Sequence, residues 1–363
     1  MRVVKAPDPA PNFARVLIEW QKKFGRNSLP WQNTRDPYRV WLSEVMLQQT
    51  QVQTVLDYYA RFLQRFPTVS ALASAKPDDV LALWSGLGYY SRARNLHRCA
   101  QQVVNDHGGK FPSTAAQLQT LAGIGPSTAA AIASICFSER VTILDGNVRR
   151  VLTRVLAFSG DLAVRSHERQ LWDLAAGFLP DHDLTEGMPR YTQGLMDLGA
   201  TVCTRRQPAC AACPVQSACQ GFAAGEPERF PVKSRKLKRS VQTLGLLWAR
   251  RPDGSVWLER RSDQGIWGGL YCLPVFDTEE AILDSLPARL KRRAAVLGPV
   301  KHVLTHKDLQ LHPVVVQFSP TDRMPVGEAE PDAPQTGGWF AANEWPALGL
   351  PAPIRKLLTA NPV

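Results

Sequence analysis

No stretch of this 363-residue chain approaches the roughly 20 consecutive apolar residues that a transmembrane helix needs. The first residues, MRVVKAPDPAP, have no apolar centre of the kind found in a secretory signal. Internal repeats and low-complexity tracts are also missing. We therefore expect a globular, cytoplasmic protein with no membrane association, and its length suits two domains.

Acidic residues are the scarcer charged class, with 32 Asp and Glu against 43 Lys and Arg. The resulting net charge of +11 favours a polyanionic partner, of which nucleic acid is the commonest. A protein that merely happens to be basic is the alternative. Cysteine is also scarce, at seven residues. In a cytoplasmic protein these are expected as free thiols or metal ligands rather than disulfides.

The spacing of apolar residues changes once along the chain. Residues 1–222 have apolar side chains at helical intervals, without a visible break over 40–66, and predict a mainly α domain. Residues 223–240 contain glycine, proline and a basic run, which indicate a linker. Residues 241–363 predict a smaller α+β domain. Its expected elements are a hairpin over 241–261, two strands over 302–318 and a closing helix over 353–358.

Four cysteines, Cys203, Cys210, Cys213 and Cys219, lie within seventeen residues in the pattern C-x6-C-x2-C-x5-C. Zinc sites with four cysteines more often present two C-x2-C pairs, and this pattern has one. A 4Fe–4S cluster held by four thiolates fits the spacing better. The loop between the first two ligands contains two arginines, so a structural role beside DNA phosphates and a role in electron transfer both remain open.

A tight glycine turn lies inside residues 118–135, LQTLAGIGPSTAAAIASI. Gly123 and Gly125 permit positive φ and close backbone approach, and Pro126 suits the first turn of a helix. Free N–H groups at the start of that helix can bind a phosphate. The segment is typical of a helix-hairpin-helix motif, and an ordinary turn between two helices is the alternative.

A second glycine turn, GLGYYSRARN at 86–95, places two tyrosines beside two arginines. Tyr89 could insert between bases while Arg92 and Arg94 meet phosphates. The alternative is that Tyr89 and Tyr90 are both core residues, because tyrosine is intermediate in its tendency to be buried.

Two carboxylates lie in settings that suit different chemistry. Glu44, in WLSEVMLQQTQV, falls in an apolar helical stripe, which should raise its pKa towards that of a general acid. Asp145, in LDGNVRRVL, precedes a helix, whose N–H groups should keep it ionised. One acid and one anion can together break a glycosidic bond. The alternatives are a glutamate that reaches solvent and an aspartate that only caps the helix.

These motifs resemble those of adenine DNA glycosylases of the MutY type, in the endonuclease III superfamily. The likeness covers essentially the whole chain, and it includes LPWQ at 29–32, GLGYYSRARNL at 86–96, LAGIGPSTA at 121–129, YTQGLMDLGATVC at 191–203 and the four cysteines. It implies a helix-hairpin-helix glycosylase domain with a 4Fe–4S cluster, followed by a Nudix-like domain. The implied partner is duplex DNA with adenine opposite 8-oxoguanine or guanine, bound by a monomer.

The resemblance also implies roles for individual residues. Glu44 would protonate adenine and later activate water, and Asp145 would stabilise the cationic sugar. Gln193 would contact the adenine, and Asn147 would order the water or Asp145. The residues implied to contact DNA or substrate are Arg26, Trp31, Leu47, Gln48, Gln49, Thr50, Tyr89, Gly123, Gly125, Ser127, Asn147, Gln193, Thr305 and His306.

Ser127 stands where strand-cleaving relatives have a lysine, and a hydroxyl cannot form a Schiff base. The resemblance therefore implies base removal with little lyase activity. In the Nudix-like domain, Leu304-Thr305-His306 corresponds to a Phe-Ser-His loop that reads 8-oxoguanine in the family, and the aromatic residue is lost. Residues 277–297 contain no R-E-x-x-E-E run, so pyrophosphatase activity is not expected.

Three rival functions can be compared with these features. A pyrimidine glycosylase with lyase activity conflicts with Ser127 and with the extra terminal domain. A damage-binding protein without catalysis would tolerate loss of Glu44 or Asp145, and both are present. An iron–sulfur electron carrier would not require the glycine hairpin or the second domain.

Overall fold

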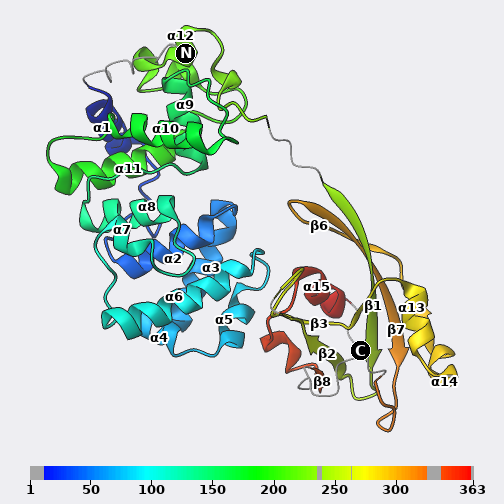
Figure 1. The fold of residues 1–363 in the computed structure, drawn as a ribbon. Helices are drawn as coiled ribbons and strands as arrows, with labels where there is room; N and C mark the ends of the chain where they lie inside the picture. Colours follow the sequence, from blue (N-terminus) through cyan, green and yellow to red (C-terminus); the bar gives the residue numbers. More distant parts are fainter. Residues whose placement is uncertain (1–11, 235–238, 263, 325–336, 361–363) are drawn as a thin grey trace. The chain divides into compact units, whose positions relative to one another are not determined.

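The computed structural model describes residues 12–234, 239–262, 264–324 and 337–360 (Figure 1). Their contacts divide the chain into two compact units. The first comprises Met1–Ala73 and Arg98–Lys236, and the second comprises Ser74–His97 and Leu237–Val363. Within the described residues, no helix combines the length and the apolar character needed to cross a bilayer.

The first unit is helical, as the apolar spacing predicted. Its core lies where α9 and α11 pack with α1, α8 and α10, and it is built from large apolar side chains such as Leu17, Leu152 and Tyr191. The helices are α1 (Phe13–Phe24), α2 (Pro37–Leu47), α3 (Val52–Arg65), α4 (Val69–Ala73), α6 (Ser91–His107, shared with the second unit), α7 (Ala115–Leu118), α8 (Pro126–Phe137), α9 (Gly146–Val155), α10 (Arg165–Ala176), α11 (Leu184–Thr201) and α12 (Gln220–Ala223).

The continuous helical pattern predicted over 40–66 is wrong in one place. Helix α2 ends at Leu47 and α3 begins at Val52, with a turn between them. Gln49 adopts a left-handed backbone conformation in this turn, with φ of 57°. The neighbouring Gln48 donates from its side-chain amide to the Thr128 hydroxyl at 3.2 Å. A contact with α8, distant in sequence, thus accompanies a break that local periodicity does not reveal.

The predicted helix-hairpin-helix is present as α7, a glycine turn and α8. Gly123 has a positive φ of 75°, whereas Gly125 is extended and caps α8, with Pro126 in the first turn. Ile124 between them is buried and anchors the turn in the core. A Cβ on Gly125 would meet no atom within 4 Å, so the backbone at the start of α8 faces open space.

The helices α9 and α11 approach each other closely at Gly199. A Cβ at this position would lie 2.7 Å from the Asn147 Cβ and 3.0 Å from the Asn147 carbonyl oxygen. Only glycine therefore allows α11 to pack against the first turn of α9. This packing places residues from the end of α11 beside Asp145, the residue before α9.

The second unit contains one mixed sheet in the order β3-β2-β1-β7-β5. The long strands β1 and β7 run parallel over eleven residues each, with α13 and α14 on one face and α15 on the other (Figure 1). The predicted β1–β2 and β6–β7 hairpins and the closing helix α15 are all found. The bounds are β1 (Ser240–Arg250), β2 (Val256–Arg260), β3 (Tyr271–Cys272), β4 (Val275–Phe276), α13 (Glu279–Ser285), α14 (Ala288–Lys291), β5 (Ala294–Val296), β6 (Val300–Val303), β7 (Lys307–Gln317), β8 (Gly337–Phe340) and α15 (Ala352–Ala360).

The segment Ser74–His97 groups with this sheet unit rather than with the helical one. It contains α5 (Pro77–Trp84) and the start of α6. The hydroxyls of Ser85 and Tyr90 donate to the Leu350 carbonyl at 2.8 and 3.0 Å. The glycine turn at 86–95 is therefore attached to the segment that precedes α15.

The segment predicted as a linker begins with residues that are packed. Phe230 is buried, and its carbonyl accepts a hydrogen bond from Arg154 Nε at 3.2 Å. The Val232 carbonyl accepts one from the Leu162 amide at 3.1 Å. Both contacts tie the chain after α12 to the helical unit. Residues 235–238, with most of the basic run, lie outside the described residues.

Candidate active site

A large cleft opens in the helical unit between the α2–α3 turn, the start of α8, the start of α9 and the last turns of α11. Its volume is about 960 Å³, at the upper end of the range for ligand sites in proteins. Both predicted catalytic carboxylates line it. The other predicted residues that line it are Arg26, Trp31, Leu47, Gln48, Gln49, Thr50, Ser127, Asn147 and Gln193.

Glu44 lies on α2, between the fully buried Ser43 and Val45, and its side chain forms part of the cleft wall. Burial, and after it the charge of Asp145, raise the pKa of its carboxyl to about 7, while the charge of Arg26 acts in the opposite direction. The acid therefore keeps its proton in neutral solution more readily than an ordinary glutamate does. This matches the character predicted from its place in an apolar stripe.

Asp145 caps α9 and accepts a hydrogen bond from the Val148 amide at 2.7 Å. Burial raises its pKa, whereas the hydrogen bonds of Val148 and Asn147 and the charges of Arg150 and Arg149 lower it. The net direction is upward. The stabilising contacts expected at the helix start are present, but desolvation of the carboxylate has a larger effect on the pKa than they do.

The two carboxyls are coupled through the cleft, and the charge of Asp145 raises the pKa of Glu44. A charged Asp145 therefore helps Glu44 to keep its proton. Such a site offers one donor and one anion to the same bound molecule. A positive charge developing on that molecule would also favour the ionised form of Asp145.

A buried aspartate to which the sequence motifs assign no role organises one wall of the cleft. Asp197 has no exposed side-chain surface and accepts from Arg26 Nε at 2.7 Å and from the Arg26 amide at 3.1 Å. It also accepts from the side-chain amides of Gln193 at 3.0 Å and Gln32 at 3.3 Å. Because Gln193 lies one turn before it on α11, Asp197 orients two predicted binding residues at once.

Helix α9 connects the cleft to the cysteine segment. Arg150 donates to the Asn147 side chain at 2.8 Å, and its Nε donates to the Cys203 carbonyl at 2.7 Å. The buried Arg154 donates to the Cys203 thiol at 3.3 Å and to the Thr204 carbonyl at 2.7 Å. The same loop supplies Thr204 and Arg205 to the cleft wall. The basic loop predicted between the first two cysteines therefore borders the site.

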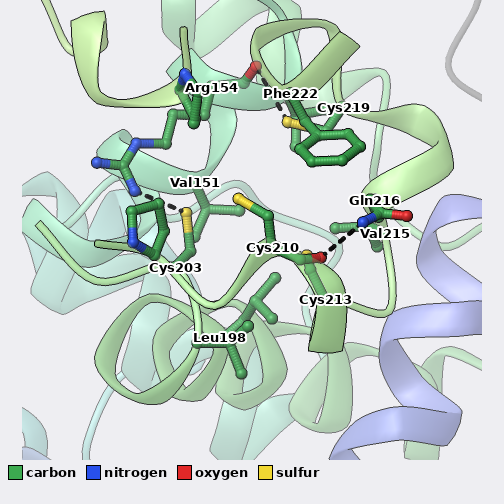
Figure 2. Close-up of a pocket in the computed structure, with 14 residues that line it drawn as sticks. Val151, Arg154, Leu198, Cys203, Cys210, Cys213, Val215, Gln216, Cys219 and Phe222 are labelled. Atoms are coloured by element: carbon green, nitrogen blue, oxygen red, sulfur yellow. Dashed lines mark hydrogen bonds between the residues drawn. The ribbon is translucent and has the colours of Figure 1, made fainter. Parts of the chain in front are cut away.

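The four clustered cysteines line a single cavity, whose other walls are mostly apolar (Figure 2). Cys203 follows α11, Cys219 precedes α12, and the other two lie in the loop between. Burial raises the pKa of Cys213 to about 11 and also raises the pKa values of Cys210 and Cys219. Metal binding must therefore release protons from these thiols.

The arrangement of the four thiols bears on which metal group they can bind. Among the described residues, no three His, Cys, Asp or Glu side chains converge closely enough for a single metal ion. The four thiols instead surround a cavity. A 4Fe–4S cluster is bound by one thiolate at each of its four irons, so it needs separated thiols around a space. The four cysteines fit this group.

The predicted DNA-contacting residues of the second unit lie on two loops. Tyr89 is 41% exposed, whereas Tyr90 is 9% exposed and hydrogen-bonded, so only one of the two tyrosines is a core residue. Thr305 and His306 are exposed in the β6–β7 turn, and the hydroxyls of Tyr89 and Thr305 are in hydrogen-bond contact. The interpretation of Arg92 as a phosphate contact is wrong, because its side chain is buried and donates to backbone carbonyls.

Comparison with known proteins gives two domain matches. Residues 42–176 match the HhH-GPD superfamily of base excision DNA repair proteins, and residues 245–360 match the NUDIX domain. The helical fold is similar to a solved thermostable thymine-DNA glycosylase, with a TM-score of 0.50 and 26% identity over 58% of this chain and 95% of that one.

Relatives of similar length extend the likeness to the whole chain. The adenine DNA glycosylase of Buchnera aphidicola subsp. Baizongia pistaciae is 33% identical over 351 residues, covering 96% of each chain. The adenine DNA glycosylase of Rattus norvegicus is 47% identical over 57% of this chain and 41% of its own. With its helix-hairpin-helix glycosylase fold and Nudix-like domain, this chain belongs to the adenine DNA glycosylase family of the MutY type.

Proposed function

We propose that this protein removes adenine mispaired with 8-oxoguanine or guanine from duplex DNA by hydrolysing the N-glycosidic bond. The observation that carries the proposal is that Glu44 and Asp145 line one cleft, where burial and the charge of Asp145 raise the pKa of Glu44. This pairing suits a reaction in which a base leaves as a neutral molecule while its sugar becomes cationic.

Glu44 donates its proton to N7 of an adenine that has been rotated out of the duplex, so that the base departs without negative charge. Asp145 then lies beside the cationic sugar and stabilises it, either as an ion pair or through a transient covalent bond. Glu44, now ionised, accepts a proton from the attacking water, which Asn147 helps to position. Asp197 supports recognition by holding Gln193 and Arg26 at the cleft.

The duplex is bound by the helical unit and its loops. Residues 1–240 contain 30 Lys and Arg against 19 Asp and Glu, so the whole charge excess of the chain lies there. The backbone amides at the start of α8, beside Gly125, bind a phosphate. Leu47, Gln48 and Gln49 fill the duplex or contact the opposite base, and the same role is proposed for Tyr89 of the second unit. Extruding the base costs a few kcal/mol, and least where pairing is already defective.

Opposite-base reading is assigned to the β6–β7 turn, where the exposed Thr305 and His306 offer polar groups to 8-oxoguanine. Ser127 lines the cleft with a hydroxyl where an amine would be needed to form a Schiff base. The proposed reaction therefore ends at the abasic site, without efficient strand cleavage, and it is carried out by a monomer.

Single-turnover cleavage of three duplexes tests this function. Adenine opposite 8-oxoguanine and opposite guanine should be released, and adenine opposite thymine should remain. Strand breaks should appear only after alkali treatment, because Ser127 cannot open the abasic sugar. Release of thymine glycol in place of adenine, or strand breaks without alkali, would contradict the proposal.

A 4Fe–4S cluster, when bound by the four cysteines, would tie the loop that brings Thr204 and Arg205 to the cleft. Metal analysis of protein purified without oxygen should find about four irons and four acid-labile sulfides per chain. One zinc ion and no sulfide would reject this cofactor. Cys99 is a control, because it is buried away from the cavity and Cys99→Ser should retain full iron content.

A further inference from the structure

Arg92 is an arginine buried in the glycine turn, and the proposed function does not use it. It is 8% exposed, and its guanidinium lies 5.3 Å from the Trp84 ring centre and 5.4 Å from the Tyr89 ring centre. Burial lowers its pKa to about 10, so the side chain remains charged in neutral solution. A charged group placed between two rings is held by cation–π attraction.

The same side chain is bonded to the backbone that leads to Tyr89. Its Nη2 donates to the Leu87 and Gly88 carbonyls at 3.2 Å each, and the Trp84 indole donates to the Gly88 carbonyl at 3.1 Å. The Arg92 amide donates to the Tyr89 carbonyl at 2.8 Å. Leu87 and Gly88, the two residues directly before the exposed ring, are thus both tied to Arg92, and Gly88 is also tied to Trp84.

This backbone needs support because Tyr89 is left-handed. Its φ is 49°, after positive values of 106° at Gly86 and 72° at Gly88. A left-handed conformation costs a non-glycine residue roughly 1 kcal/mol or more, so surrounding contacts must hold it. An extended backbone at this position would send the ring in another direction.

We propose that Arg92 is a positioning residue that presents the Tyr89 ring for insertion into the base stack. Its guanidinium lies over the ring and its hydrogen bonds fix the backbone, while Tyr89 stays 41% exposed and its ring is available to stack on a base. The inference rests on the proposed function, in which Tyr89 enters the duplex. A purely structural role for Arg92 is the competing explanation.

The two explanations differ in what happens once Tyr89 is absent. If Arg92 acts through the ring, its replacement should cost nothing more in a Tyr89→Ala background. If Arg92 only supports the fold, the two losses should add. A double-mutant cycle of Tyr89→Ala and Arg92→Met separates the explanations, because methionine retains much of the apolar packing while removing the charge and the donors.

The measurement uses the full-length holoprotein and a duplex with adenine opposite 8-oxoguanine and 2-aminopurine next to the 8-oxoguanine. Insertion of a ring unstacks the probe and raises its fluorescence. Each single variant should lose most of this rise and bind about tenfold more weakly, the usual effect of losing one stacked base. The double variant should match Tyr89→Ala. Arg92→Lys, which keeps a cation between the rings, should recover part of the signal.

The controls keep the outcomes distinct. Arg98→Met removes an exposed arginine farther along α6 and should leave the fluorescence rise intact. Additive losses in the double variant, or a full rise with Arg92→Met, would overturn the Arg92 inference while leaving the proposed reaction in place. Wild-type fluorescence and affinity in Tyr89→Ala would overturn ring insertion and the Arg92 inference together.

Discussion

Replacing Glu44 with glutamine should lower the rate of adenine release about a hundredfold or more, the usual contribution of a general acid. Glutamine has nearly the same shape, but its amide cannot donate a proton to a leaving base in this way. Affinity for the duplex should stay close to that of the unsubstituted protein, because the cleft keeps its form. Single-turnover rates and equilibrium binding, measured on the same duplex, check both parts.

The assignment of Glu44 as the acid also predicts how the rate of adenine release changes with pH. Burial and the charge of Asp145 raise the pKa of Glu44 to about 7, and only the protonated form can donate. The rate should therefore be highest below pH 7 and fall about tenfold for each further pH unit above it. The residual rate of the Glu44→Gln variant should lack this decline. A wild-type profile that stays flat from neutral to alkaline pH would contradict the assignment of Glu44 as the acid.

The cleft shows which parts of a site can be predicted from sequence. Glu44 stood out because a charged residue in an apolar stripe conflicts with its surroundings, and the four cysteines stood out by their spacing. Asp197 lies in the segment YTQGLMDLGATVC, but no spacing or motif assigns it a role. Its importance comes from Arg26, which is 171 residues away along the chain, and from buried side-chain contacts that only the fold creates.

Arg92 and Asp145 show why the environment of a charge is harder to predict than its position. The turn containing Tyr89 was identified, but its arginine points inward because carbonyls freed by left-handed residues need donors. For Asp145 the cap was identified correctly, yet burial of the site has a larger effect on its pKa than the cap does. The sequence indicates which nearby groups can bond to a charged side chain. The effect of desolvation on its pKa depends on all the residues that pack around it in the fold.

The fold likewise has features that local sequence predicts and features that it does not. Helices, hairpins and the closing helix follow from local periodicity and turn residues, and they were predicted. The parallel pairing of β1 with β7 joins strands separated by more than fifty residues, from Ser240 with Lys307 to Arg250 with Gln317. Nothing local specifies that partnership, because the choice between possible partners depends on which faces α13 and α15 cover.

Replacing Asp145 with asparagine should separate its two roles. Asparagine caps a helix about as well as aspartate, so the bond to the Val148 amide can be kept while the negative charge is lost. We expect the rate of adenine release to fall about a hundredfold or more, the usual cost of removing an electrostatic group that stabilises a transition state. Single-turnover rates and thermal unfolding of the same variant measure the two effects.

The stability of that variant should be equal to or higher than that of the unsubstituted protein. Because the pKa of Asp145 is raised in the folded state, its ionised form opposes folding at every pH above the folded-state pKa. A neutral side chain removes that cost. Asp145→Ala, which is also neutral but loses the cap, should be less stable than Asp145→Asn by about 1 kcal/mol. If the asparagine variant kept the wild-type rate, Asp145 would act only as a helix cap. If the variant were slower but at least as stable, the buried charge of Asp145 would serve catalysis at the expense of folding stability.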